Sequence, residues 1–246
     1  MNRTAEYKFT IIIPYYNEEE NIPRLEKALA DYLDKALVKP VCVLFVNDGS
    51  TDGGAALVEE ACSRHPQFFH LDFERNYGKS AALAAGFANT FSDYCGYMDA
   101  DLQTVPEDFN ILLERLPYNA MVTGIRADRK DSGFYNFQSK LGNGWRQLFT
   151  HDNAIDTGCP LKVFKTSCAR KLPSYEGMHR FIPALVILQD GATYEQLPIR
   201  HFARTAGKSK YNAWNRLGRT FADCFGYLWL KPRLKDYIIN RSNLEQ

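Results

Sequence analysis

Short apolar runs alternate along the chain with segments in which apolar residues recur every three or four positions. The apolar runs, the second of which ends in a turn-rich loop, predict strands at 8–17, 40–54, 68–74, 93–101 and 119–126. The periodic segments between them predict helices at 18–37, 55–65, 78–91 and 105–116. Strands that are apolar on both faces and alternate with helices are typical of a parallel sheet covered on both sides. We therefore predict an α/β fold with a mainly parallel, doubly wound sheet and helices on both faces.

The pattern is looser after residue 126. A polar loop followed by a helix is predicted over 127–150, and a strand followed by a short helix over 158–172. A buried helix is predicted at 179–191 and a further strand at 192–202. Beyond them lies a basic loop at 204–212, which we expect to be flexible.

Composition narrows the class of protein. The 246 residues are 45% hydrophobic, enough for a full core, and the formal net charge of +1 argues against a nucleic-acid binder. The six cysteines contain no C-x-x-C pair, so we expect small buried side chains in a reducing compartment rather than a zinc or redox site. We find no signal peptide, and no apolar run approaches the roughly 20 residues that span a bilayer. Contact with a membrane surface stays open.

Polar residues stand where the predicted strands end. Asn17-Glu18 follows the first strand, Asn47-Asp48 the second, and Asp99-Ala100-Asp101 the fourth. In doubly wound sheets, ligands bind outside the carboxyl ends of the strands. We call this edge the carboxyl-end rim and expect the site there.

The Asp99-Ala100-Asp101 run suits a divalent cation. Alternation in an extended segment places both carboxylates on one side, and Gln103 adds an amide oxygen on that side. Hard cations such as Mg²⁺ or Mn²⁺ prefer oxygen ligands, and a bound cation relieves the repulsion between the two aspartates. The alternative is structural: Asp101 caps the helix at 105–116.

Two neighbouring segments each allow two interpretations. In "VNDGSTDGG", Asp48 either meets the base or ribose of a nucleotide or belongs to an ordinary turn in which Asp52 is a helix cap, and the dinucleotide fingerprint is absent. In "NYGKSAA", Lys79 and the helix N-terminus either meet an anion or simply start a helix after Gly78. A Walker motif is excluded because position 73 is Phe.

Five segments together indicate a family. "IIIPYYNEEENI", "VNDGSTDG", "RNYGKSAALAAGF", "MDADLQTVPE" and "AGKSKYN" occur in an order that resembles the inverting family-2 glycosyltransferases of GT-A fold. More narrowly, they are similar to the dolichyl-phosphate mannose synthase and polyprenyl-phosphate sugar transferase branch, over roughly residues 8–212. The resemblance implies a GT-A catalytic domain at 1–211, with a nucleotide half at 1–126 and an acceptor half at 127–211. An amphipathic helical tail at 212–246 follows.

The resemblance also implies roles for individual residues. Together with the reading of "NYGKSAA", it assigns nucleotide-sugar binding to Pro14, Tyr16, Glu18, Asp48, Lys79 and Asp99. The metal and diphosphate site falls on Asp99, Asp101 and Gln103, with Mg²⁺ or Mn²⁺ as the cofactor. Acceptor binding falls on Arg126 and on a closing loop that carries Arg204, Ser209 and Lys210. The five histidines show no metal-ligand spacing, and His201, which precedes this loop, is the one to test. We expect Asp101, Arg126, Arg204 and Lys210 to be catalytic.

Two departures from the family pattern stand out. Relatives usually carry Asp-Asp-Gly-Ser where this chain has Asn47-Asp48, so the identity of the base stays open. Relatives also often carry a basic residue shortly before the segment of Ser139, where this chain has Asn136-Phe137-Gln138. The second departure weakens the assignment of the acceptor phosphate to that helix.

The expected reaction is inverting transfer of a sugar from a nucleoside-diphosphate sugar to a polyprenyl phosphate. A phosphomonoester has a second pKa of about 6, so the acceptor is ionised at neutral pH and needs no strong base. The nearest alternative is transfer to a sugar hydroxyl, for which Asp156 or Glu176 is the candidate base. A nucleotidyltransferase and a non-catalytic, nucleotide-sugar-binding peripheral membrane protein are the alternatives of other kinds.

The tail predicts membrane contact. Its apolar residues share one helical face: Trp214, Leu217, Phe221, Phe225, Leu228 and Trp229. The basic residues Lys231, Arg233 and Lys235 follow, as is typical of a helix in a membrane interface. We expect peripheral contact through 212–235, on the cytoplasmic side of the membrane. The alternative is a helix packed on the domain or in a dimer, and the oligomeric state is open.

Overall fold

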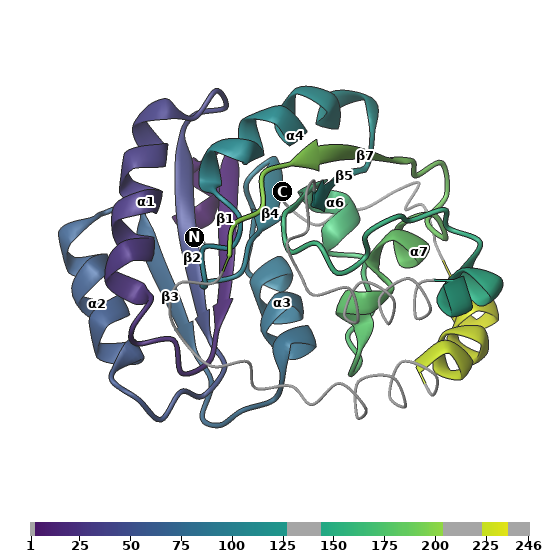
Figure 1. Ribbon diagram of the computed structural model, residues 1–246, viewed down its shortest axis with the longest axis horizontal. Coiled ribbons are helices and arrows are strands. Elements are labelled where there is room, and N and C mark those ends of the chain that lie inside the picture. The colour runs from purple at the N-terminus through teal and green to yellow at the C-terminus, as the bar shows by residue number, and fades with distance from the viewer. Residues whose placement is uncertain (1–2, 127–143, 204–222, 236–246) are drawn as a thin grey trace, which may run out of the picture.

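The computed structural model describes residues 3–126, 144–203 and 223–235. Within them one seven-stranded sheet has the order β3-β2-β1-β4-β6-β5-β7 (Figure 1). The strands are β1 (Phe9–Tyr15), β2 (Val41–Asn47), β3 (Phe68–Asp72), β4 (Tyr94–Tyr97), β5 (Met121–Arg126), β6 (Lys162–Lys165) and β7 (Tyr194–Ile199). Each neighbouring pair is parallel except those that β6 makes with β4 and β5. The predicted, mainly parallel sheet is confirmed.

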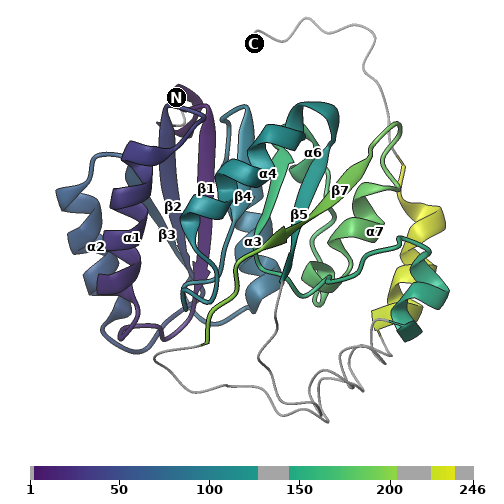
Figure 2. The same cartoon turned by 45° about the horizontal axis from the view of Figure 1, so that its top comes forward.

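Helices cover both faces of the sheet (Figure 2). One face packs on α1 (Ile22–Lys35), α2 (Gly54–Arg64) and α4 (Phe109–Arg115). The other packs on α3 (Lys79–Ala88), α6 (Thr166–Ala169) and α7 (Ile182–Val186). Short 3₁₀ turns are η1 (Arg3–Glu6), η2 (Pro106–Asp108), η3 (Leu116–Tyr118), η4 (Met178–Arg180) and η5 (Lys231–Arg233), and residues 144–150 and 223–230 are also helical. The fold is doubly wound, as predicted.

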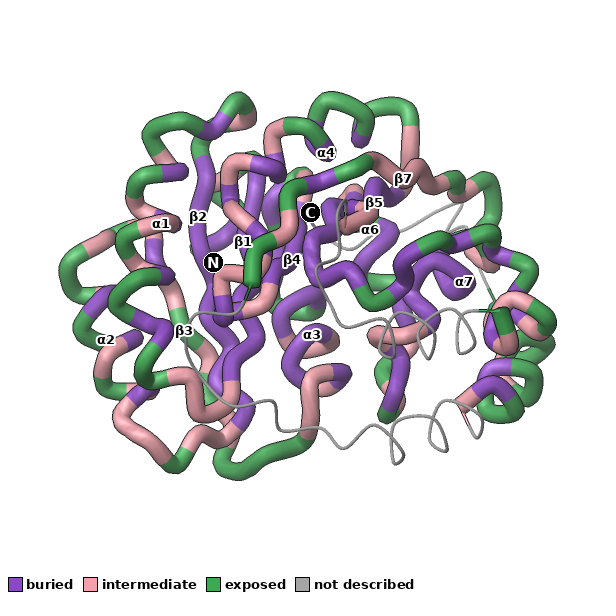
Figure 3. Tube along the Cα trace, in the orientation of Figure 1, coloured by how far each residue is buried: buried purple, intermediate pink, exposed green. Residues whose placement is uncertain are grey.

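The central strands are buried on both faces (Figure 3). In β1, Ile11 and Ile13 belong to the core under α1 and α2, whereas Ile12 belongs to the core against α3. All three are fully buried, which explains why this strand reads as a continuous apolar run and not as an alternating one. Five of the six cysteines are buried, as the sequence predicted, and none forms a disulfide.

Several elements are shorter than their sequence patterns predicted, among them one strand and one helix beside the candidate site. The strand predicted at 93–101 ends at Tyr97, because the chain turns at Ala100 and Leu102 has a positive φ of 54°. The helix predicted at 179–191 consists of η4 and α7 and ends at Val186, and the turn that follows, with Gly191 at φ 67°, leads to β7.

Strand β6 enters the sheet between β4 and β5 and runs antiparallel to both. Its first residue, Lys162, therefore pairs with Tyr97, the last residue of β4, and with Thr123 of β5. The chain that precedes β6 lies, as a result, at the carboxyl-end rim.

The helix at 223–230 packs on the domain through one face. Cys224 and Tyr227 are fully buried there, and the Tyr227 ring stacks on Phe181 with the ring centres 5.6 Å apart. The alternative that the tail helix packs on the domain is correct for this face. The opposite face exposes apolar side chains, with Phe225 61% and Trp229 62% accessible. Residues 212–222 of the predicted tail lie outside the described residues.

No helix among the described residues is long and apolar enough to cross a membrane.

Candidate active site

The loops after β1 and β2 are joined to each other. The Asn17 side-chain oxygen accepts the backbone N–H of Thr51 at 2.7 Å, and Ser50 Oγ accepts the N–H of Asn17 at 2.9 Å. Gly49 lies against the loop after β3: its φ is 70°, and a Cβ there would be 2.2 Å from the carbonyl carbon of Arg75. A side chain is excluded at this position. The loops after β1, β2 and β3 therefore pack together as one unit of the carboxyl-end rim.

Asp48 holds the loop that leads into α3. Its carboxylate accepts the backbone N–H groups of Tyr77 at 2.7 Å and Gly78 at 3.0 Å and the side-chain amide of Asn76 at 2.9 Å. Burial raises the pKa of Asp48, and these three hydrogen bonds oppose the rise. The structure thus gives Asp48 an anchoring role, and its contact with a nucleotide stays a prediction.

The amide at position 47 has a specific partner. Asn47 ends β2 beside Asp72, which ends β3, and its Nδ2 donates to Asp72 Oδ1 at 2.9 Å. Its Oδ1 accepts the N–H of Ser50 at 2.9 Å. An aspartate at position 47 would face the Asp72 carboxylate, so the departure from the family pattern matches its surroundings in this chain.

The remaining first-half residues lie where the sequence placed them. Pro14 is buried within β1, and Tyr16 is half-buried just after it. Glu18 accepts the side-chain amide of Asn21, at the start of α1, at 2.6 Å. Asp52 accepts the N–H of Gly54, the first residue of α2, at 3.0 Å, but the N-cap position of this helix is Gly53, which has no side-chain cap.

The two aspartates differ in environment. Asp99 is half-buried and forms an ion pair with Lys79, the first residue of α3. Asp101 is buried, with 6% of its surface exposed, and accepts the backbone N–H of Gln103 at 3.2 Å. The capping alternative is wrong, because the helical segment that begins at Pro106 follows Val105 and has no side-chain cap. Lys79 starts its helix and pairs with Asp99, and the contact of this helix N-terminus with a ligand anion stays a prediction.

The exit from β7 is fastened to this aspartate turn. The Phe202 N–H donates to the carbonyl of Gln103 at 2.9 Å. Arg200 binds the buried Asp108 through its backbone N–H and its Nε, each at 2.8 Å. His201 lies between these contacts, near the predicted metal site. Three predicted acceptor residues lie outside the described residues: Arg204, Ser209 and Lys210.

Arg126 ends β5 and is held by Asp156. Its Nε donates to Asp156 Oδ2 and its Nη2 to Oδ1, both at 2.8 Å, and the two side chains are 12% and 9% exposed. This two-pronged pairing fixes the plane of the guanidinium. Both oxygens of Asp156 are engaged, which counts against Asp156 as the base of the alternative reaction.

The structure adds a residue that sequence reasoning missed. Lys162 is fully buried, donates from Nζ to the carbonyls of Thr157 (3.2 Å) and Cys159, and lies 5.6 Å from the ring centre of Tyr97. Burial lowers the pKa of Lys162 to about 8. A lysine inside the apolar run "CPLKVF" was the available signal. His179 meets Ser80, in the first turn of α3, at 2.8 Å.

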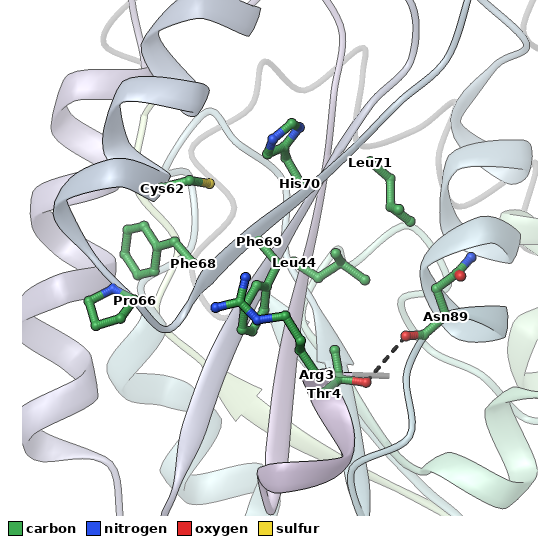
Figure 4. Close-up of a pocket in the computed structure, with 10 residues that line it drawn as sticks. All are labelled: Arg3, Thr4, Leu44, Cys62, Pro66, Phe68, Phe69, His70, Leu71 and Asn89. Carbon is green, nitrogen blue, oxygen red and sulfur yellow. Dashed lines mark hydrogen bonds between the residues drawn. The ribbon is translucent and has the colours of Figure 1, made fainter. Parts of the chain in front are cut away.

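A surface cavity of about 410 Å³ lies beside β3, the strand at one edge of the sheet (Figure 4). Phe68 and His70 line it from the face of the sheet on which α2 packs, and Phe69 and Leu71 from the opposite face. None of the site residues predicted from the sequence lines it. The cavity is therefore separate from the candidate site.

Residues 10–171 match the family model described as Glycosyl transferase family 2. The match covers more than half of the chain, and the chain therefore belongs to this family of enzymes. The predicted resemblance is confirmed.

Curated relatives point to one branch of the family. The chain is 34% identical over 204 residues to the undecaprenyl-phosphate 4-deoxy-4-formamido-L-arabinose transferase of Edwardsiella ictaluri (strain 93-146), covering 82% of this chain and 62% of that protein. It is 35% identical over 217 residues to the protein of the same name from Pseudomonas aeruginosa (strain LESB58), covering 86% and 62%. The chain thus spans 62% of the length of these relatives. Their names agree with the predicted polyprenyl-phosphate branch.

Solved structures share the fold. Glucosyl-3-phosphoglycerate synthase from Mycobacterium tuberculosis, in complex with Mn²⁺, UDP and glucosyl-3-phosphoglycerate, superposes with a TM-score of 0.70 at 16% identity, covering 95% of this chain and 82% of that one. Mannosyltransferase PcManGT from Pyrobaculum calidifontis, in complex with GDP-Man and Mn²⁺, gives 0.65 at 19% identity, covering 93% and 68%. The predicted GT-A fold is confirmed.

Proposed function

We propose that this protein transfers a sugar from a nucleoside-diphosphate sugar to a polyprenyl phosphate, with inversion at the anomeric carbon. One observation carries the proposal. The acidic turn after β4, the Lys79 end of α3, Arg126 at the end of β5 and the exit from β7 meet at the carboxyl-end rim. A donor diphosphate and an acceptor phosphate both need charged partners, and this rim offers partners of both signs. The undecaprenyl-phosphate relatives support the choice of acceptor.

The donor set at the acidic turn fits Mg²⁺ or Mn²⁺. Asp99, Asp101 and the amide of Gln103 offer oxygen atoms only, which hard divalent cations prefer. No three His, Cys, Asp or Glu side chains gather for a metal in the described parts of the chain, so water and the diphosphate would complete the coordination. When bound, the cation neutralises charge on the departing diphosphate. Lys79, which pairs with Asp99, supplies positive charge beside it.

The acceptor side needs orientation more than proton transfer. The phosphate of a polyprenyl phosphate is largely ionised at neutral pH, because its second pKa is about 6. Arg126, with its guanidinium plane fixed by Asp156, binds and orients that phosphate in our proposal. Arg204 and Lys210, in the loop after β7, are proposed as its other partners. The exit from β7, which precedes these two residues in the sequence, is attached to the Gln103 turn.

We also propose that the tail keeps the enzyme on the membrane that holds its lipid acceptor. Phe225, Leu228 and Trp229 of helix 223–230 are exposed, and of these Phe225 also contacts the Phe149 ring, with the ring centres 5.8 Å apart. Lys231 and Arg233 follow directly and are exposed. Exposed aromatic residues beside cations suit the interface of a membrane with anionic lipids.

A panel of nucleotide sugars tests the reaction. Each is incubated with undecaprenyl phosphate or the unphosphorylated prenol, with Mg²⁺ or Mn²⁺, and lipid-linked product is measured. We expect product with the phosphate only. Asp101→Asn should abolish turnover while the fold is kept, because an amide oxygen still accepts the Gln103 N–H. Asp93→Asn, at an exposed ion pair with Lys8, is the matched control and should stay active. Transfer only to a sugar hydroxyl would support the alternative acceptor.

A further inference from the structure

The turn at residues 156–159 contacts the guanidinium of Arg126 and fixes its position. Asp156, at its start, binds two nitrogens of the guanidinium. Gly158 contacts the same guanidinium: a Cβ at this position would be 3.1 Å from Arg126 Nη2, closer than most real Cβ contacts. The position of the guanidinium therefore depends on where this turn lies.

Lys162 holds the same turn by hydrogen bonds. Its ammonium group donates to the carbonyls of Thr157 and Cys159, which lie on either side of Gly158. The side chain is fully buried in β6, with its Nζ 5.6 Å from the centre of the Tyr97 ring. Lys162 is thus anchored in the middle of the sheet, while its end group holds a turn at the carboxyl-end rim.

Burying a lysine in a protein core is unfavourable in free energy. Removing an ammonium group from water costs several kcal/mol unless it is well paired, and apolar residues of similar size often stabilise a fold more. The pKa of Lys162, lowered to about 8, reflects this cost. Nearby Lys79 and Arg126 add to the lowering, and Asp156 opposes it. Packing alone thus does not explain a lysine at this position.

We infer that Lys162 is a positioning residue for the acceptor phosphate. It fixes the carbonyls of the 156–159 turn, the turn holds Asp156, and Asp156 sets the orientation of Arg126. This inference rests on the proposed function, in which Arg126 binds the phosphate of the acceptor. It assigns Lys162 no contact with substrate.

Steady-state kinetics separates positioning from a general loss of stability. Lys162→Met should raise the KM for the polyprenyl phosphate about tenfold, because small misplacements of a binding group are costly, and leave the donor KM nearly unchanged. Gly158→Ala should shift the acceptor KM in the same direction, since its methyl group displaces Arg126 without removing Lys162. Lys165→Met is the matched control. Lys165 lies on the same strand, and its ammonium donates to the carbonyl of Pro117 at an exposed site.

A second readout does not depend on activity. The ¹H–¹⁵N resonance of the Arg126 Nε group, assigned with Arg126→Lys, reports its hydrogen bond to Asp156. We expect it to move in Lys162→Met and Gly158→Ala and to stay in place in Lys165→Met. If Lys162→Met does not fold, Lys162→Gln, which keeps a donor, carries the test and should show a smaller change of the same kind.

The outcomes are distinct. An unchanged acceptor KM and an unmoved Arg126 resonance in the Lys162 variants overturn the inference. An equal rise in donor and acceptor KM also overturns it, because that result indicates general disorder of the site. If the wild-type protein transfers no sugar to polyprenyl phosphate, the proposed function fails. The Arg126 resonance then still decides whether Lys162 positions the turn.

Discussion

The pairing of Asn47 with Asp72 predicts that restoring the usual family residue will destabilise this chain. In Asn47→Asp, the Nδ2 donor that lies 2.9 Å from Asp72 Oδ1 becomes a carboxylate oxygen. Two full charges about 3 Å apart repel by about 5.5 kcal/mol at an effective dielectric constant of 20. The Asp72 side chain is 43% exposed, so rotation, water and proton uptake reduce this value. We expect a net loss of about 1–3 kcal/mol in the free energy of unfolding.

The pH dependence distinguishes repulsion from a lost hydrogen bond. In Asn47→Asp, the carboxylate pair holds a proton more tightly in the folded state than in the unfolded state. Its pKa is raised, so the destabilisation is largest at pH 7 and shrinks as the pH falls through the raised value. Asn47→Ala is the control: it loses the bonds to Asp72 and Ser50 at a cost of about 1 kcal/mol each, with little dependence on pH.

Urea denaturation of the wild type and both variants between pH 4 and pH 8 measures these differences. Our reasoning predicts that the curves for Asn47→Asp and the wild type converge toward pH 4. Equal stability of the two proteins at pH 7, or a difference that does not change with pH, would refute the proposed repulsion with Asp72.

Three further predictions concern other parts of the molecule. Lys79→Met leaves Asp99 without its ion-pair partner, so Mn²⁺ should raise the melting temperature more in the variant than in the wild type; equal shifts would contradict metal binding at Asp99. Hydrogen bonds from Arg64 and, to a smaller extent, His65 lower the pKa of Glu26 in the folded state. Ionised Glu26 therefore stabilises the fold at pH values above its pKa in the unfolded state, and this contribution is lost as the pH falls through the lowered pKa. Glu26→Gln should cost about 1 kcal/mol at pH 7 and nothing near pH 3 in urea denaturation. Trp229→Ser should weaken sedimentation with anionic vesicles several-fold at an unchanged melting temperature, and unchanged sedimentation would count against the membrane proposal.

The sequence predicted the first half of the molecule well because its signals are local. The run of Ile11, Ile12 and Ile13 predicts a strand buried on both faces, and parallel topology then brings Asp48 and Asp99 to one edge. The contacts of those side chains depend on distant segments. Nothing near Asp99 in the sequence indicates Lys79, 20 residues away, as its partner.

The second half was harder to predict because β6 inserts between two earlier strands. Its antiparallel course brings Lys162 beside Tyr97, and the turn before it brings Asp156 to Arg126, 30 residues away. No periodicity encodes such a crossing. The strand itself is four residues long, too short for a clear alternation. Side-chain partners in this half are therefore set by topology and not by local pattern.

Crystals soaked with Mn²⁺ and a nucleoside-diphosphate sugar test the central claim most directly. We predict an anomalous peak at the Asp99–Asp101 turn, with the diphosphate oxygens bound to it and the nucleotide above the ends of β1 and β2. Absence of the metal from that turn, with the nucleotide bound elsewhere on the protein, would contradict the proposed site and the reaction built on it.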